Sequence, residues 1–103
     1  MHIVIFITSA NKKEAAKIAQ ALIKNKLAAC VNIAGNLQSI FRWEGKIDQA
    51  KEILLVVKSK KEKLNKIIKL VKSLHSYETP EIIALPIVGG FKPYLNWINE
   101  SLR

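Results

Sequence analysis

The first quarter of the chain carries a strand-like pattern of apolar residues and then a helix-like one. Residues 2–8 form a nearly continuous apolar run rich in β-branched side chains, which is typical of a buried strand. Asn11 follows, with Glu14 three positions later, and this pair favours the start of a helix. Apolar residues then recur at helical spacing to about residue 26. We therefore predict a strand followed by a helix.

The next stretch has the pattern of an unusually long β-hairpin. Residues 27–43 alternate as a strand does, with an expected bulge or bend at residues 35–36. Residues 44–45 supply a turn, and a second arm covers about residues 47–58. Each arm would span roughly 40 Å when extended, about twice the usual strand length. A small domain cannot cover such arms, so we expect the hairpin to project and to pair with another copy of the chain.

The second half of the chain begins with a signal for a helix. Ser59 and Glu62 match the S-x-x-E capping box. The helix behind them has apolar residues on one face and lysines on the other. Residues 77–81 break this helix, and residues 82–88 have the pattern of a strand. Pro86 within that run indicates an edge strand.

The remaining residues complete a recognisable order of elements. A turn at residues 89–90 and Pro93, which suits the first turn of a helix, predict a short closing helix to Leu102. The order is therefore β-α-β-β-α-β with one helix appended. Such a chain forms a four-stranded antiparallel sheet with two helices on one face. We predict an α+β fold, a ferredoxin-like plait with an extended β-hairpin and a short C-terminal helix, as one domain over residues 1–103.

The composition restricts which compartment and which partners we expect for the protein. Half of the 103 residues are apolar, yet a small domain buries only about 60–65% of its chain surface, so we expect oligomerisation. No segment approaches the roughly 20 apolar residues of a membrane span, and the apolar run near residue 5 is too short for a signal peptide. Cys30 is the only cysteine, which fits a reducing compartment. We expect a cytoplasmic protein with no membrane partner.

The net charge of +9 raises the question of a nucleic-acid partner. Seven of the fifteen lysines lie in residues 58–72, interleaved with apolar residues at helical spacing, as on a solvated helix face. An RNA-recognition module with this plait needs exposed aromatic residues on its central strands, where this sequence has mainly aliphatic ones. We therefore do not expect nucleic-acid binding.

Metal-ligating residues are present but scattered. Copper and related ions favour Cys, His and Met ligands, and we predict His75, Cys30 and Glu78 as the candidate metal ligands. No C-x-x-C or H-x-x-x-H spacing supports a tight site. The alternatives are that Cys30 packs as a small apolar residue and that His75 interacts with a helix dipole.

Residues 75–81 form the best candidate for a ligand pocket. We predict that Tyr77, Glu78 and Glu81 line it and that Lys58 adds a cation from the end of a strand. The alternative is a rigid connector held by Tyr77 and Pro80. Because the sequence has no P-loop, no G-x-G-x-x-G and no evident catalytic triad, we expect no enzymatic activity.

Four blocks of sequence, in the same order, resemble the CutA family of divalent-cation and copper tolerance proteins. They are residues 26–33 (KLAACVNI), 40–47 (IFRWEGKI), 75–83 (HSYETPEII) and 94–97 (YLNW). The resemblance spans nearly the whole chain and implies a ferredoxin-like subunit in a homotrimer whose hairpins pair across subunits. It also implies an association with copper or another divalent cation.

The resemblance suggests where the subunits meet and where the chain departs from its family. We place Trp43, Phe41 and Ile40 at the trimer interface, since large aromatic residues often anchor interfaces; stacking on a ligand is the alternative for Trp43. Some relatives have a cysteine in the first strand and two adjacent histidines, where this chain has Ile7 and Leu74-His75.

Two functions follow from these observations. The first is a trimeric CutA-type protein of divalent-cation (copper) tolerance that binds metal weakly or conditionally. The second is a trimeric sensor similar to PII signalling proteins, which binds a small anionic ligand in an intersubunit cleft through Lys58, Tyr77 and Glu78.

Overall fold

The computed structural model describes all residues from Met1 to Arg103. A short 3₁₀ turn, η1 (Lys61–Lys63), precedes the second α-helix. The other elements are β1 (His2–Ser9), α1 (Lys12–Lys24), β2 (Cys30–Trp43), β3 (Lys46–Lys60), α2 (Leu64–Leu74), β4 (Ile82–Pro86) and α3 (Lys92–Ser101). This order confirms the predicted β-α-β-β-α-β pattern with a closing helix.

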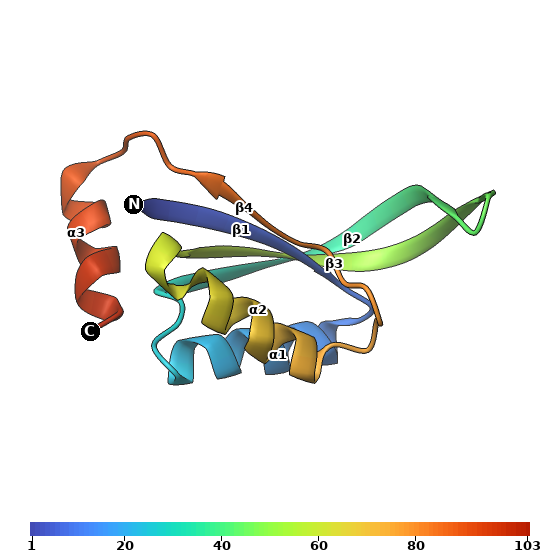
Figure 1. The fold of residues 1–103 in the computed structure, drawn as a ribbon, viewed down its shortest axis with the longest axis horizontal. Coiled ribbons are helices and arrows are strands. Elements are labelled where there is room, and N and C mark those ends of the chain that lie inside the picture. The colour runs from blue at the N-terminus through green and yellow to red at the C-terminus, as the bar shows by residue number, and fades with distance from the viewer.

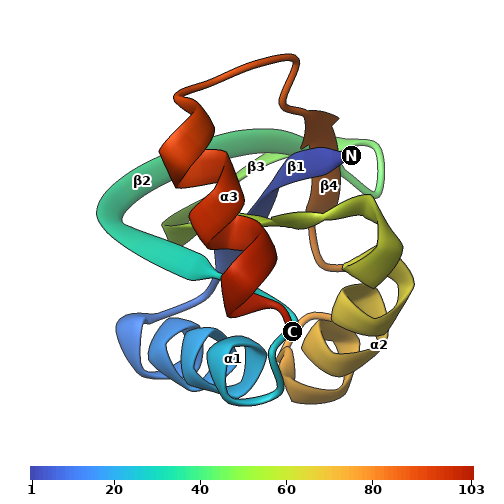
Figure 2. The ribbon, with the colours of Figure 1, turned by 90° about the vertical axis from the view of Figure 1, so that its left-hand side faces the viewer.

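The four strands form one antiparallel sheet in the order β2-β3-β1-β4. Helices α1 and α2 lie side by side on one face of this sheet, and α3 lies at one end of it (Figures 1 and 2). This arrangement confirms the ferredoxin-like plait. We call the sheet face opposite α1 and α2 the open face. Only its end is reached by a helix, where Leu95 and Asn99 of α3 contact His2.

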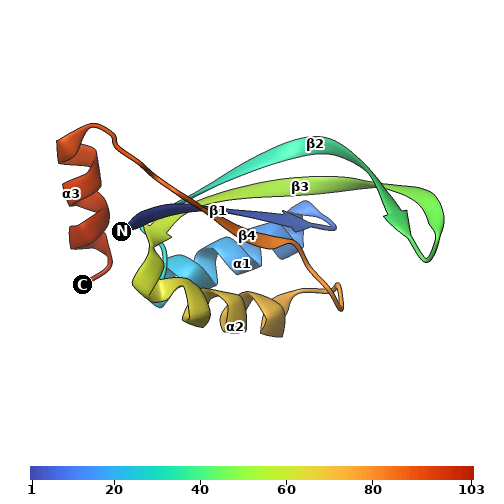
Figure 3. The ribbon, with the colours of Figure 1, turned by 45° about the horizontal axis from the view of Figure 1, so that its top comes forward.

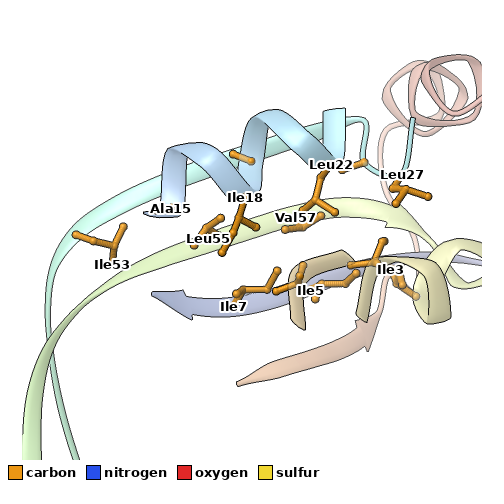
Figure 4. Packing of buried hydrophobic residues seen from close by; sticks show 14 residues of the cluster. Ile3, Ile5, Ile7, Ala15, Ile18, Leu22, Leu27, Ile53, Leu55 and Val57 are labelled. Carbon is orange, nitrogen blue, oxygen red and sulfur yellow. The ribbon is translucent and has the colours of Figure 1, made fainter. Parts of the chain in front are cut away.

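The core lies between the sheet and the two helices (Figure 4). Ile5 and Ile7 of β1 are fully buried, as are Ile18 and Leu22 of α1. Each such side chain contributes about 1.5–3 kcal/mol through burial. The alternating residues Val4 and Phe6 point to the open face and are only half-buried. The apolar side chains of β1 thus alternate between two faces of the sheet. Within a single chain, only the face towards α1 and α2 is fully buried.

The hairpin of β2 and β3 is the longest feature of the molecule. Its strands have 14 and 15 residues, and it projects beyond the helices (Figure 3), giving the chain dimensions of 45 × 25 × 23 Å. A register shift between Ala34 and Leu37 confirms the predicted bulge, and Asn36 there has φ 64°. Glu44 and Gly45 both have positive φ, as a two-residue hairpin turn requires.

Two local predictions need correction. Ser59 and Glu62 do not cap α2, because Ser59 is the buried penultimate residue of β3 and its hydroxyl donates to the Leu27 carbonyl at 2.6 Å. The helix instead begins through η1, without a side-chain cap. The last strand ends at Pro86, earlier than predicted, although its position at the sheet edge is confirmed.

Candidate functional site

The loop of residues 75–81 joins α2 to β4 and is fastened by the buried side chain of His75. Its Nδ1 accepts a hydrogen bond from the Tyr77 amide at 3.0 Å. The ring proton therefore resides on Nε2, which donates to the Thr8 carbonyl at 2.6 Å. Both ring nitrogens are thus engaged within the chain, and His75 acts here as a structural anchor.

Glu14 fastens the same loop to the start of α1. Its carboxylate accepts hydrogen bonds from the Ser76 amide at 2.7 Å, the Ser9 hydroxyl at 2.6 Å and the Ala10 amide at 3.3 Å. Burial raises the pKa of Glu14, but these hydrogen bonds outweigh it and hold the pKa below its ordinary value. Asn11 accepts from the Glu14 amide at 2.8 Å, which confirms the predicted helix cap.

Tyr77 reaches from the loop to β3, where its hydroxyl donates to Glu52 Oε2 at 2.9 Å. Glu52 is only 8% exposed. Burial, followed by the hydrogen bond to Glu52 and the charges of Glu52 and Glu14, raises the pKa of Tyr77 to about 12. The phenol therefore stays protonated and continues to donate at neutral pH.

A groove lies between this loop and the outer half of the projecting hairpin, with a volume of about 740 Å³. We call it the Tyr77 groove. Its hairpin wall includes Ile40, Phe41 and Trp43, and its loop wall includes Tyr77, Glu78 and Glu81. The structure thus brings three predicted pocket residues together with the three predicted interface residues.

The groove also contains residues that the sequence reasoning missed. Asp48 and Glu52 of β3 line it. The sequence did contain a signal for Glu52. This residue directly precedes the apolar run that starts at Ile53, and the alternation of side chains along a strand directs it to the open face. A carboxylate there faces the sheet surface that no helix covers.

Lys58 does not line the Tyr77 groove. It lies opposite Cys30 and Val4 in the sheet, six residues beyond Glu52 and about 20 Å further along β3. Its Nζ lies 3.9 Å from the Cys30 Sγ. The cation expected for an anionic ligand is therefore absent from the groove within one chain.

The three predicted metal ligands are not brought together in one chain. Cys30 lies opposite Lys58, whereas His75 contacts Thr8, which lies opposite Leu54, roughly 13 Å along the strand. Only Glu78 of the three lines the Tyr77 groove. No cluster of three His, Cys, Asp or Glu side chains is arranged to hold a metal ion.

No helix of the chain is long and apolar enough to cross a membrane.

Comparison with known proteins gives consistent matches along the chain. The family described as CutA1 divalent ion tolerance protein matches residues 3–101. The divalent-cation tolerance protein CutA of Archaeoglobus fulgidus is 47% identical over 103 residues, covering 100% of both chains. The chloroplastic protein CutA of Arabidopsis thaliana is 41% identical over 101 residues, 98% of this chain. The alignment covers 56% of that plant relative, so the chain spans a little over half its length.

Solved structures match equally well. The divalent cation tolerance protein of Thermus thermophilus superposes with a TM-score of 0.97 at 44% identity, covering 98% of both chains. The Archaeoglobus fulgidus protein, described as periplasmic, gives a TM-score of 0.97 at 47% identity and covers 100% of both chains. The descriptions of these relatives thus include two different compartments.

Proposed function

Because the chain belongs to the CutA1 divalent ion tolerance family, we propose that it acts in divalent-cation tolerance, with copper as the first ion to test. The match along residues 3–101 is the observation that supports this role. The proposed form is a homotrimer without catalytic activity. The proposed compartment is the cytoplasm, which suits a chain whose only cysteine is Cys30.

The open face supports assembly. Val4, Phe6 and Val56 of the two central strands lie on it, beside Ile83 and Leu85 of the edge strand. Large exposed apolar patches on a small protein usually mark an interaction surface. The occupant we propose is the open face of other copies of the chain, which would leave α1 and α2 outside.

The hairpin supports the same assembly. Ile40, Phe41 and Trp43 remain exposed, with Trp43 at 54%. A projecting strand pair with unburied aromatic residues suits pairing across subunits. We therefore keep these three residues as the proposed hairpin part of the interface.

Metal binding in this proposal is weak or shared between subunits. One chain does not collect three ligands, and both nitrogens of His75 are already hydrogen-bonded. Cys30 is partly exposed and free. A soft ion such as copper would suit Cys30 if a second copy supplied further ligands.

A sensor of small anions is the weaker alternative. Lys58 does not line the Tyr77 groove, and the groove has no Lys, Arg or His side chain. Its carboxylates would repel an anion. Such a sensor would need cationic side chains from a neighbouring subunit.

The assembly is tested by sedimentation equilibrium on a matched pair of variants. Ile83 is 50% exposed on the open face, and Ile68 is 39% exposed on α2. We expect a wild-type mass three times that of the chain, with dissociation in Ile83→Asp and an unchanged mass in Ile68→Asp. A monomeric or dimeric wild type, or a trimer indifferent to Ile83→Asp, would contradict the proposed assembly.

The metal role is tested by calorimetric titration of the reduced protein with copper(II) and zinc, beside Cys30→Ser and His75→Ala. We expect weak copper binding that Cys30→Ser reduces. Because His75 anchors the loop, His75→Ala is also expected to destabilise the protein. Any change in its metal binding is therefore compared with its measured loss of stability. If none of these proteins shows a heat of binding, direct metal binding is excluded from the proposal.

A further inference from the structure

The positive charge of this chain is concentrated in two segments. Residues 12–26 and residues 61–72 each contain five lysines and one glutamate. These segments include helices α1 and α2, and together they carry +8 of the net charge of +9. The rest of the chain is nearly neutral, with seven Lys and Arg residues against six Asp and Glu residues. The charge of the molecule is thus a property of one layer of the fold.

The exposed lysines of the two helices form one surface, which we call the lysine layer. On α1 they are spaced four and seven residues apart, which places them on one side of the helix, and on α2 they are three residues apart. Because α1 and α2 lie side by side over the sheet (Figures 1 and 2), the two rows of lysines are neighbours. Helix α1, with 13 residues, gives the layer a length of about 20 Å. The layer consists of Lys13, Lys17, Lys24, Lys66, Lys69 and Lys72, all of them exposed.

No carboxylate neutralises the lysine layer within the chain. None of the ion pairs of the molecule includes one of its lysines. Glu14 is the only acidic residue of the two helices, and its oxygens accept from Ser9, Ala10 and Ser76 instead. Lys72 is the one member of the layer with a hydrogen bond, and it donates to backbone carbonyls. The layer therefore holds like charges that repel one another, and an anionic partner would relieve this repulsion.

The lysine layer lies on the opposite side of the sheet from the open face. Figure 3 shows α1 and α2 below the sheet, with the hairpin projecting beyond them. The layer is accessible in a single chain, and the proposed assembly through the open face and the hairpin would leave it outside. A partner of this surface therefore competes with no contact between copies.

The composition of the layer does not suit the recognition of nucleic-acid bases. Helices α1 and α2 contain no Phe, Trp or Tyr on which a base could stack, and no Arg. The two arginines lie elsewhere, at Arg42 in the hairpin and Arg103 after α3. Lysine acts on a phosphate group as a point charge. The layer can thus attract phosphate groups without distinguishing bases.

The layer also lacks the apolar surface that a bilayer or a protein partner would cover. Its other outward positions are polar, namely Gln20, Asn65 and Ser73. Ile23 and Ile68 are partly exposed, but each lies about 100° around its helix from the adjacent lysine, at the flank of the layer. Interfacial helices insert an apolar face into the bilayer, and protein interfaces have an apolar core. A purely ionic partner fits this surface better than either.

We propose that the lysine layer binds linear inorganic polyphosphate. The ammonium groups of both rows pair with successive phosphates of a chain that lies along α1 and α2. Such a chain carries negative charge on every phosphate unit, and it has neither bases nor acyl chains that the surface would have to accommodate. This interaction goes beyond divalent-cation tolerance and does not rest on it. It uses no residue that we propose for metal binding or for the assembly.

The proposal is tested by calorimetric titration of the full chain with polyphosphate at several salt concentrations, in the absence of divalent cations. The polyphosphate chains are longer than the layer, and pyrophosphate is the short comparison. The layer variant combines Lys13→Gln, Lys17→Gln and Lys69→Gln at exposed positions, so the fold should persist. A second variant combines Lys13→Arg, Lys17→Arg and Lys69→Arg and keeps the charge.

The matched control combines Lys46→Gln, Lys51→Gln and Lys92→Gln. These lysines are exposed but lie outside α1 and α2. The control loses the same charge as the layer variant, and circular dichroism verifies the fold of every variant. A difference between the two therefore reports the position of the lost charge and not its amount.

We expect polyphosphate to bind the wild type and pyrophosphate to bind clearly more weakly. With the six lysines of the layer engaged, the logarithm of the binding constant should fall with the logarithm of the salt concentration with a slope of about −4. The slope should be about −2 in the glutamine layer variant and unchanged in the arginine variant and the control. At physiological salt, the glutamine layer variant should bind at least about tenfold more weakly than the wild type.

Three results would overturn the proposal. The first is the absence of polyphosphate binding to the wild type at millimolar concentrations. The second is equal weakening in the layer variant and the matched control, which would show only general attraction to a basic chain. The third is equally tight binding of single-stranded DNA with the same number of phosphates, or of vesicles that contain phosphatidylglycerol, which would assign the layer to a nucleic acid or to a membrane surface.

Discussion

Replacing Glu14 with glutamine tests whether one carboxylate fastens the 75–81 loop to the first helix. Glu14 accepts from the Ser76 amide through Oε1, and from the Ser9 hydroxyl and the Ala10 amide through Oε2. Glutamine offers a single oxygen. Its NH₂ group must therefore face at least one of these donors, which leaves that donor unpaired.

The cost can be worked from these contacts. A hydrogen bond to a charged group contributes about 1.5–3 kcal/mol. The Ser76 and Ala10 amides are exposed, so water can replace part of the contact that either of them loses. We expect Glu14→Gln to lower the free energy of unfolding by about 1–2 kcal/mol at neutral pH.

The same carboxylate predicts a pH dependence. The hydrogen bonds hold the folded-state pKa of Glu14 below the ordinary 4.5. A group with a depressed folded pKa stabilises the protein above its unfolded pKa and loses that contribution as pH falls through its folded pKa. The advantage of wild type over Glu14→Gln should therefore be full above pH 4.5 and should shrink at lower pH.

Urea denaturation at neutral and acidic pH measures this difference, and hydrogen exchange of the Ser76 amide reports the loop directly. Glu100→Gln is the matched control, because its exposed pair with Arg103 should contribute at most about 1 kcal/mol. Equal urea midpoints for Glu14→Gln and wild type at neutral pH would refute the reasoning. A stability gap that persists undiminished in acid would refute the role assigned to the charge.

Two further predictions concern the core and the tyrosines. Leu22→Ala should destabilise the fold by about 2–5 kcal/mol. Ile23→Ala, at the adjacent exposed position, should destabilise it clearly less. Urea denaturation of both variants measures the difference, and equal losses of stability would contradict the burial of Leu22. In Tyr94→Phe, the tyrosinate absorbance should rise with a midpoint of about 12, because Tyr77 then titrates alone; a midpoint near 10 would show that its hydroxyl does not meet Glu52.

Local patterns were sufficient to predict most of the fold. The apolar run of β1, the two long arms of the hairpin, the helical stripe of α1 and the cap at Asn11 each depend on neighbours in the sequence, and the structure confirms them. The bulge near Asn36 was also readable, because glycine and asparagine accept positive φ. These features need no knowledge of the rest of the chain.

The predicted capping box is wrong because the Ser59 hydroxyl is hydrogen-bonded to a residue that is distant in the sequence. The Ser59 hydroxyl is used by the Leu27 carbonyl, 32 residues away in sequence. Nothing in the local S-x-x-E pattern reveals that competitor. The Ser9 hydroxyl shows the opposite case, since its contact with Glu14 lies within five residues and was within reach of local reasoning.

The candidate site was only partly predictable for the same reason. Tyr77, Glu78 and Glu81 lie on one short loop, so their proximity follows from sequence spacing. Glu52 and Asp48 join them only through the register of β3 against β1 and the end of α2. Lys58 lies on the same sheet face as Glu52, and only its distance along β3 excludes it from the groove.

The position of charge, more than its total, decides which ligands this chain can bind. The net charge of +9 comes largely from lysines on exposed surfaces, including Lys66 and Lys69 on the outer face of α2. Screening reduces their field over about 8 Å at physiological ionic strength. A ligand that has entered the Tyr77 groove therefore interacts chiefly with the local carboxylates, of which Glu52 is the least screened because it is the most buried. The fold thus collects acidic side chains at this groove and excludes basic ones, although the chain as a whole is basic.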